Sequence, residues 1–150
     1  MQPAASALAA ALAAALLFAA ALQVTVAEVP EKLKEIAAKC RGEHPISDDE
    51  LNGLKSLTIP ETDEGKCFLG CMFEEMGLLV DGKFSQENAV KIMKEKLEEK
   101  PDEIEKHMQL IEKCNDEVAS HDNKCETGPK LLECFKTFAP GFGIVLPGSE

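Results

Sequence analysis

Six cysteines are the residues of this chain whose types and spacing best support covalent chemistry, and that chemistry is oxidation to disulfide bonds. They stand at Cys40, Cys67, Cys71, Cys114, Cys125 and Cys134, with gaps of 26, 3, 42, 10 and 8 residues. An even number of cysteines behind an apolar N-terminal stretch is typical of a disulfide framework that forms after export. Cys67 and Cys71 stand four apart in a segment with helical periodicity, so both side chains lie on one helix face. We expect them to bond to two different parts of the chain and not to each other.

Hydrolysis has one candidate pair of residues. His121 and Asp122 stand shortly before Cys125. This arrangement resembles the His-Asp pair of secreted phospholipases, in which the histidine activates water. A small secreted hydrolase is therefore an alternative function. The glycine-rich calcium loop and the adjacent cysteines of such enzymes are missing from the sequence, however. We expect His121 to face solvent in the polar stretch 120–124, and we assign no catalytic residue.

Metal and cofactor sites are also poorly supported. The sequence contains no Cys-x-x-Cys pair, and its three histidines, His44, His107 and His121, are scattered. Structural zinc sites need such ligands at short, regular spacings. No Gly-x-Ser-x-Gly motif of a serine hydrolase is present either. We therefore expect neither a metal nor a cofactor, and no enzymatic activity.

Residues 1–27 predict a secretory signal peptide. They carry no charged side chain, consist mostly of Ala and Leu, and end in the small-residue stretch 25–27. A transmembrane anchor is the competing interpretation, because the run approaches the length that a bilayer needs. The weak hydrophobicity of Ala and the lack of flanking basic residues favour cleavage near Ala27. Residues 28–150 then form a single secreted, extracellular domain.

The charge of the chain restricts its partners. The formal net charge is −11, whereas nucleic acids and anionic membranes are bound by clustered Lys and Arg. No second apolar run is long enough to span a bilayer, so we expect no membrane insertion once the signal is removed. This acidity is typical of a soluble secreted surface.

The cysteines must be positioned by helices, because apolar residues recur at helical spacing along most of the chain. This periodicity predicts an all-α fold of about six helices with short connections. Caps and prolines place the helix starts near Pro30, Ser47, Thr62, Ser85, Pro101 and Pro129. We expect four of these helices to end at Gly42, Pro60, Gly77 and the dipeptide 140–141, respectively. Residues 78–80 are expected to be a loop that enters a turn at Asp81-Gly82.

The C-terminal segment 139–150 combines apolar side chains with Pro and Gly, which prevent a stable helix. An exposed apolar strip of this kind favours association, so we expect the segment to lie across the helices and cover apolar surface. If it covers a ligand site, deletion of residues 140–150 is expected to change ligand affinity.

The order C-x26-C-x3-C-x42-C-x10-C-x8-C resembles that of insect odorant-binding proteins, the six-cysteine pheromone-binding and general odorant-binding family. The leader, the acidic character and the segment 81–84 strengthen the resemblance, which covers essentially the whole mature chain. It implies disulfides Cys40–Cys71, Cys67–Cys125 and Cys114–Cys134, and six helices around an internal apolar cavity. It also implies a secreted carrier that binds volatile odorants or pheromone-like molecules and transports them through extracellular fluid such as sensillar lymph. A membrane odorant receptor is then a further partner, and we expect a monomer or weak homodimer.

Met and Phe side chains suit the wall of such a cavity, because Met adapts its shape and Phe offers a wide apolar face. The expected wall comprises Leu69, Phe73, Met76, Val90, Met93, Leu97, Met108, Ile111, Leu132 and Phe135, closed by Phe142 and Val145 of the tail. The same residues are equally suited to a solid core, which would make the chain an interaction module without a cavity. A non-olfactory carrier of extracellular lipophiles on the same scaffold also remains open.

Overall fold

The computed structural model describes residues 30–98 and 100–149. The predicted signal peptide, residues 1–27, lies outside these residues. Residues 31–150 form one compact unit, and the following description concerns this unit alone. None of its helices combines the length and the apolar character that a membrane span requires.

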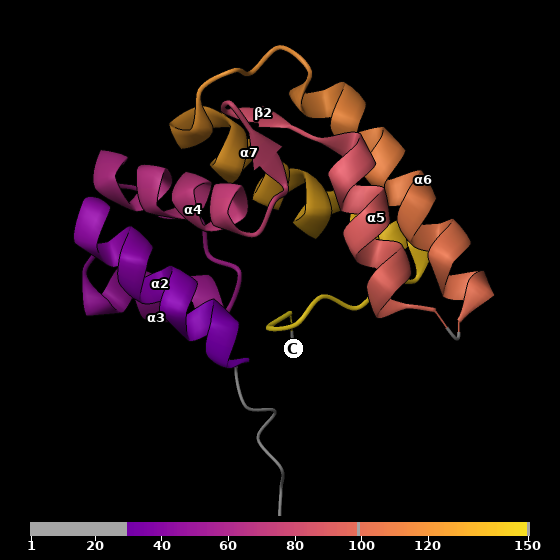
Figure 1. Ribbon diagram of the computed structural model, residues 1–150, viewed down its shortest axis with the longest axis horizontal. Coiled ribbons are helices and arrows are strands. Elements are labelled where there is room, and N and C mark those ends of the chain that lie inside the picture. The colour runs from indigo at the N-terminus through magenta and orange to yellow at the C-terminus, as the bar shows by residue number, and fades with distance from the viewer. Residues whose placement is uncertain (1–29, 99, 150) are drawn as a thin grey trace, which may run out of the picture. The chain divides into compact units, whose positions relative to one another are not determined.

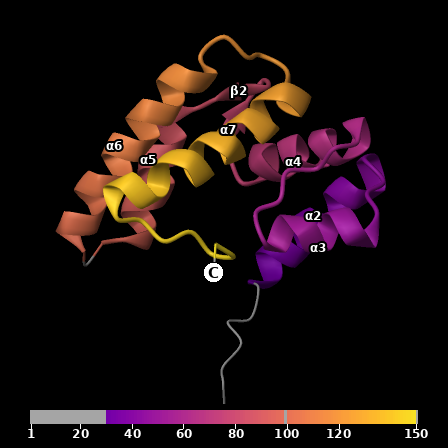
Figure 2. The same ribbon diagram turned by 180° about the vertical axis from the view of Figure 1, so that it is seen from behind.

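The described residues contain six α-helices, as the sequence predicts: α2 (Glu31–Glu43), α3 (Asp48–Lys55), α4 (Asp63–Glu75), α5 (Gln86–Lys96), α6 (Pro101–Val118) and α7 (Lys124–Phe138). The three predicted N-caps are present, since Ser47, Thr62 and Ser85 each accept a hydrogen bond from the backbone N–H three residues on. Helices α5 and α6 lie side by side, and α4 and α7 lie between them and the pair α2 and α3 (Figures 1 and 2).

Helix α7 begins five residues earlier than predicted, at Lys124 instead of Pro129. Asn123 caps it by accepting a hydrogen bond from the backbone N–H of Cys125 (2.9 Å). Pro129 therefore lies inside the helix, where it removes one backbone hydrogen bond. Burial of Thr127 and Gly128 against the rest of the unit compensates for this loss. A proline inside a helix is a poor marker of its start when the preceding turn packs this well.

Residues 78–84 differ from the predicted loop, because they contain a short antiparallel hairpin. Strand β1 (Leu79–Val80) pairs with β2 (Lys83–Phe84), so that Leu79 faces Phe84. The turn residues Asp81 and Gly82 have φ angles of 52° and 77°, and an Asp-Gly pair in this left-handed conformation is the favoured two-residue hairpin turn. The hydroxyl of buried Thr127 donates a hydrogen bond to the Gly82 carbonyl (2.6 Å), which fixes the hairpin on α7.

Helices α4 and α7 cross at two glycines. A Cβ atom built on Gly128 would lie 2.8 Å from the Gly70 Cα atom, and one on Gly70 would lie 2.2 Å from the Lys124 carbonyl oxygen. The Cys67–Cys125 disulfide lies three residues before each glycine, and its Cα atoms are 4.0 Å apart. Small residues are therefore required on both helices for their backbones to approach this closely.

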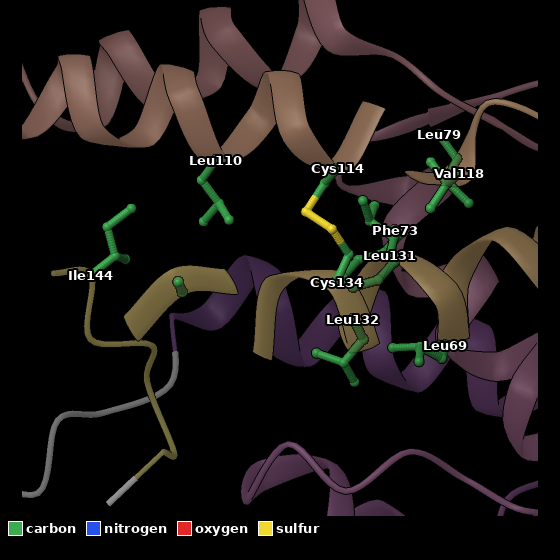
Figure 3. Packing of buried hydrophobic residues seen from close by; sticks show 11 residues of the cluster. Leu69, Phe73, Leu79, Leu110, Cys114, Val118, Leu131, Leu132, Cys134 and Ile144 are labelled. Carbon is green, nitrogen blue, oxygen red and sulfur yellow. A yellow bond between two sulfur atoms is a disulfide. The ribbon is translucent and has the colours of Figure 1, made fainter. Parts of the chain in front are cut away.

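The other two disulfides are Cys40–Cys71 and Cys114–Cys134. These are the pairs that the family resemblance implies. Cys67 and Cys71 join α4 to α7 and to α2, so the two cysteines on one face of a helix reach different parts of the chain. The third bond joins α6 to α7 (Figure 3). Among the described residues no cysteine is free.

The main apolar cluster joins α4, α6 and α7 with the hairpin and the C-terminal segment. Its buried residues include Leu69, Phe73, Leu131 and Leu132. Figure 3 shows Leu110 and Ile144 at one end of this cluster, and Phe73, Leu79 and Val118 at the other. A second cluster joins α2 to α4, and a third, smaller one joins α5 to α6.

The junction of α3 and α4 depends on one carboxylate. Glu50 accepts hydrogen bonds from the Thr62 hydroxyl (2.7 Å) and the Thr62 backbone N–H (3.3 Å). The Thr62 hydroxyl bond is the largest cause that holds the pKa of Glu50 below its usual value of 4.5. A lowered pKa in the folded state stabilises the protein at pH values above 4.5, and this stabilisation is lost as the pH falls through the lowered pKa.

We therefore expect Glu50→Gln to reduce the acid sensitivity of folding. The wild type should lose more of its free energy of unfolding than the variant between pH 6 and about pH 3, because only the wild type must protonate this carboxylate. Urea denaturation at a series of pH values measures the difference. Parallel pH profiles for the two proteins would contradict the role of Glu50.

Candidate functional site

A surface pocket of about 370 Å³ lies between the C-terminal end of α3, the last turns of α7 and the C-terminal segment. Its apolar lining consists of Leu57, Pro140, Ile144 and Leu146. Three of these, Leu57, Ile144 and Leu146, also belong to or pack against the main apolar cluster. Side chains that line the pocket thus pack on the main cluster, and its volume lies in the range of small-molecule sites.

Leu57 is held in this pocket by an unusual backbone conformation. Its φ angle is 57°, in the left-handed region where a non-glycine residue is disfavoured by about 1–2 kcal/mol. Leu57 N–H bonds to the Leu54 carbonyl and Thr58 N–H to the Gly53 carbonyl (3.0 and 2.8 Å). This pattern ends a helix with a residue that is usually glycine. Leucine here places a large apolar side chain in the pocket at the expense of backbone strain, which is a pattern found at functional sites.

The C-terminal segment closes one side of the pocket. After the 3₁₀ turn η1 (Ala139–Phe142), the Ile144 N–H bonds to the Ala139 carbonyl (3.0 Å). The segment then turns back from the end of α7 toward α3 (Figures 1 and 2). Gly148 lies so close to α3 that an added Cβ would be 2.0 Å from the Lys55 carbonyl oxygen. The predicted covering of apolar surface by the tail is therefore present.

Within the tail, the prediction of Val145 as a closing residue does not fit the structure, because its side chain is 75% exposed. Ile144 is 5% exposed and lines the pocket together with Leu146. The alternation of an extended chain explains the difference, since residues two apart face the same side and their neighbour faces away. Phe142 is partly buried against the main cluster.

The predicted wall residues divide between two clusters instead of surrounding one space. Leu69, Phe73, Met76, Leu132, Phe135 and Phe142 belong to or pack against the main cluster. Met93, Leu97, Ile111 and Val90 belong to or pack against the cluster between α5 and α6. The first group packs in the main cluster and the second group packs α5 on α6. None of the predicted wall residues lines the pocket at the tail.

Met108 and Val90 do not lie in the pocket at the tail. They line a separate surface groove of about 340 Å³ between α5 and α6, and Met108 is 42% exposed. Helix α6 turns Leu110 into the interior, and Met108, two residues earlier, therefore lies on roughly the opposite side of the helix.

The candidate hydrolytic residues, His121 and Asp122, lie in the connection between α6 and α7. His121 is half-buried and not solvent-facing, since its side chain is 27% exposed and its Nδ1 lies 3.7 Å from a carboxylate oxygen of Glu126. Asp122 contributes its backbone carbonyl to the close contact with Gly82. In the described part of the chain, no three His, Cys, Asp or Glu side chains gather closely enough to hold a metal ion.

Sequence reasoning missed Leu57, Lys136, Ile144 and Leu146. The helix expected to end at Pro60 ends at Lys55, so Leu57 lies beyond it, and no sequence signal reveals that Leu57 adopts a left-handed conformation. Ile144 and Leu146 are recognisable from their two-residue spacing in a segment that cannot be helical. Lys136 is an exposed residue in the last turn of α7, and it lines the pocket only because the tail returns to α3.

The chain is similar to odorant-binding proteins over most of its length. Residues 23–137 match the PBP/GOBP family. General odorant-binding protein 56a of Drosophila melanogaster is 31% identical over 114 residues, which cover 75% of this chain and 77% of the relative. General odorant-binding protein 72 of Anopheles gambiae is 23% identical over 120 residues, covering 79% of this chain and 97% of the relative.

The fold is also that of a solved member of this group. The structure of odorant-binding protein dmelOBP28a from Drosophila melanogaster superposes with a TM-score of 0.65 at 24% identity, and the match covers 76% of this chain and 94% of that one. The disulfide framework, the six helices and the sequence matches all indicate the same family. The chain belongs to the PBP/GOBP family, the insect odorant-binding proteins.

Proposed function

We propose that this protein is a secreted carrier of small hydrophobic molecules, which it binds in the pocket between α3, α7 and the C-terminal segment. The single observation that carries the proposal is the pocket itself, whose apolar residues continue into the main cluster. The predicted leader and the six disulfide-bonded cysteines support secretion. The names of the relatives support odorants as cargo and the fluid around sensory neurons as the place of transport.

The inner wall that we propose for a bound ligand consists of partly buried apolar side chains of the main cluster. Among those that pack against the main cluster are Leu54, Ile59, Met76, Phe135 and Phe142. None of them is fully enclosed by protein, although each lies beside fully buried neighbours. A ligand chain that enters past Leu57 and Ile144 removes more of this apolar surface from water.

The hydrophobic effect accounts for the affinity. Burial of apolar surface yields about 25 cal/mol per Å², so a ligand with roughly 300 Å² of such surface gains several kcal/mol. Lost translational and rotational freedom offsets part of this gain. The balance supports micromolar rather than picomolar dissociation constants, which suits a carrier that must also release its cargo.

Access to the pocket does not require the core to unfold. Helix α3 contributes no fully buried side chain, and Ile144 is the one buried residue among residues 143–149. Elements with so few buried contacts separate at a low free-energy cost. We expect α3 and the tail to part when the ligand enters, while the disulfide-linked helices α4, α6 and α7 stay in place.

Replacing Leu57 by glycine tests this function. Residues 28–150 contain every described element and all six cysteines, and they should bind the fluorescent probe N-phenyl-1-naphthylamine with micromolar affinity. Leu57→Gly should weaken probe binding about tenfold, since it removes an apolar wall. The free energy of unfolding should change by no more than about 1–2 kcal/mol, because relief of the left-handed strain opposes the lost packing.

Val80→Ala is the matched control, because Val80 is 48% exposed on the hairpin and does not line the pocket. Its probe affinity should equal that of the wild type. Absence of saturable probe binding to the wild type would refute the carrier function. Equal effects of the two substitutions would place the binding site elsewhere.

A further inference from the structure

One residue that lines the pocket at the tail, the exposed Lys136, carries a formal charge, and this charge bears on the kind of ligand that fits. Lys136 is the only ionised side chain among the described residues that line the pocket. The remaining lining is apolar apart from Ser56, Ser149 and the backbone of Gly148. A cation at the mouth of an apolar pocket is the arrangement that matches an amphiphile with a negative head and a hydrocarbon tail.

Lys136 is also not engaged elsewhere in the described part of the chain. Six other lysines form ion pairs there, namely Lys34, Lys39, Lys106, Lys113, Lys124 and Lys130. Glu133, one turn before Lys136 on the same helix face, is paired with Lys130 (3.0 Å). The ammonium group of Lys136 therefore finds no carboxylate partner among the described residues.

The two serines at the rim differ in their hydrogen-bonding capacity. The Ser149 hydroxyl donates to the Leu146 carbonyl (2.7 Å), which fixes the last turn of the tail. The Ser56 hydroxyl makes no hydrogen bond within the described residues, so its donor is available to a ligand in the pocket that Lys136 also lines. An ammonium and a hydroxyl donor together suit a carboxylate, which accepts several hydrogen bonds and donates none.

We infer that the preferred ligands of this site are carboxylate amphiphiles such as medium-chain fatty acids, with the head held by Lys136 and the hydrocarbon chain directed past Leu57 and Ile144. This inference rests on the proposed carrier function and adds the class of cargo. The protein's charge of −11 repels anions at long range, but salt screens that repulsion beyond about 8 Å at physiological ionic strength. Direct contact between the carboxylate head and Lys136 is much shorter than this screening length, so salt weakens it less.

Two ligands of equal chain length test the inference. Decanoate and decan-1-ol differ in the head alone, and decanoate is ionised at pH 7.5. Isothermal titration calorimetry with residues 28–150 should give tighter binding for decanoate. Lys136→Gln should weaken decanoate binding about tenfold, the effect of one charge-assisted hydrogen bond, and should leave decanol binding within about twofold. The matched control Lys91→Gln removes the same charge from an exposed position of α5 outside the pocket and should change neither affinity.

Other outcomes separate the inference from the function on which it rests. If Lys136→Gln leaves decanoate binding unchanged, or weakens both ligands equally, the head is not held by Lys136 and the inference is wrong. If the wild type prefers decanol, the cargo class is wrong while the carrier function stands. If neither ligand nor the fluorescent probe binds, the carrier function itself fails.

Discussion

Replacing Gly70 by alanine is expected to destabilise the helical unit by about 1–2 kcal/mol, although alanine is the better helix former. The added methyl group would lie 2.2 Å from the Lys124 carbonyl oxygen and 2.6 Å from its carbon. Both atoms belong to the backbone of α7, so they cannot rotate away as a flexible side chain would. Forced overpacking of this kind typically costs 1–3 kcal/mol, which exceeds the helix-propensity gain of about 1 kcal/mol from Gly to Ala.

Gly42 provides the matched control for this substitution. It also lies in a helix, α2, but no atom comes within 4 Å of a Cβ built on it. Gly42→Ala should therefore stabilise the protein by about 0.5 kcal/mol. Urea denaturation with the disulfides intact gives both values. If Gly70→Ala were neutral or stabilising, the backbones of α4 and α7 would not be in the close contact described.

The second large effect is expected at Ile144. We predict that Ile144→Asn weakens binding of N-phenyl-1-naphthylamine at least tenfold, whereas Val145→Asn leaves it within about twofold. Ile144 is 5% exposed and lines the pocket, and Val145 beside it is 75% exposed. Loss of a buried aliphatic side chain removes about 1.5–3 kcal/mol of apolar contact, and a factor of ten in affinity corresponds to 1.4 kcal/mol.

This pair of substitutions controls for the chemistry of the change, since both replace a β-branched aliphatic residue by the same amide. Fluorescence titration should be accompanied by circular dichroism to establish that each variant is folded. Deletion of residues 140–150 should reproduce the loss seen with Ile144→Asn. Equal affinities in the Ile144 and Val145 variants would mean that the tail packs on the protein without forming part of the ligand site.

Most of the fold could be predicted from the sequence because its signals are local. Ser47, Thr62 and Ser85 are caps whose hydrogen bonds involve residues three positions away, and such bonds depend little on the rest of the chain. Helical periodicity likewise predicted the helices on which the cysteines lie. The spacing of all six cysteines, taken together, then predicted the family. The match to the family model agrees with that prediction.

The start of α7 could not be predicted, because it depends on contacts between distant segments. Pro129 is a strong local signal for a helix start, yet the structure continues the helix back to Lys124. The close contact of Gly128 with Gly70 and the hydrogen bond from Thr127 to Gly82 stabilise that preceding turn. Gly70 and Gly82 are both far from Pro129 in the sequence, so the local pattern does not indicate either contact. The Asp81-Gly82 hairpin, by contrast, had a local signal that we interpreted as an isolated turn.

None of the predicted wall residues lines the pocket at the tail, for a similar reason. Apolar residues such as Phe73 and Leu132 were correctly expected to be inward-facing, but the sequence does not indicate which inward face borders a hollow. Val90 and Met108 accordingly lie in the groove between α5 and α6. Leu57 and Lys136 reach the pocket because the tail returns to α3, and that path depends on packing across the whole unit.

Methyl NMR of residues 28–150 during a titration with decan-1-ol tests the central claim most directly, because it locates the ligand in solution. We predict saturable shifts of the methyl resonances of Leu57, Ile144 and Leu146, with those of Val90 and Ile104 unchanged. Shifts confined to Val90 and Ile104, which line the groove between α5 and α6, would contradict the account. So would a spectrum that does not respond to the ligand.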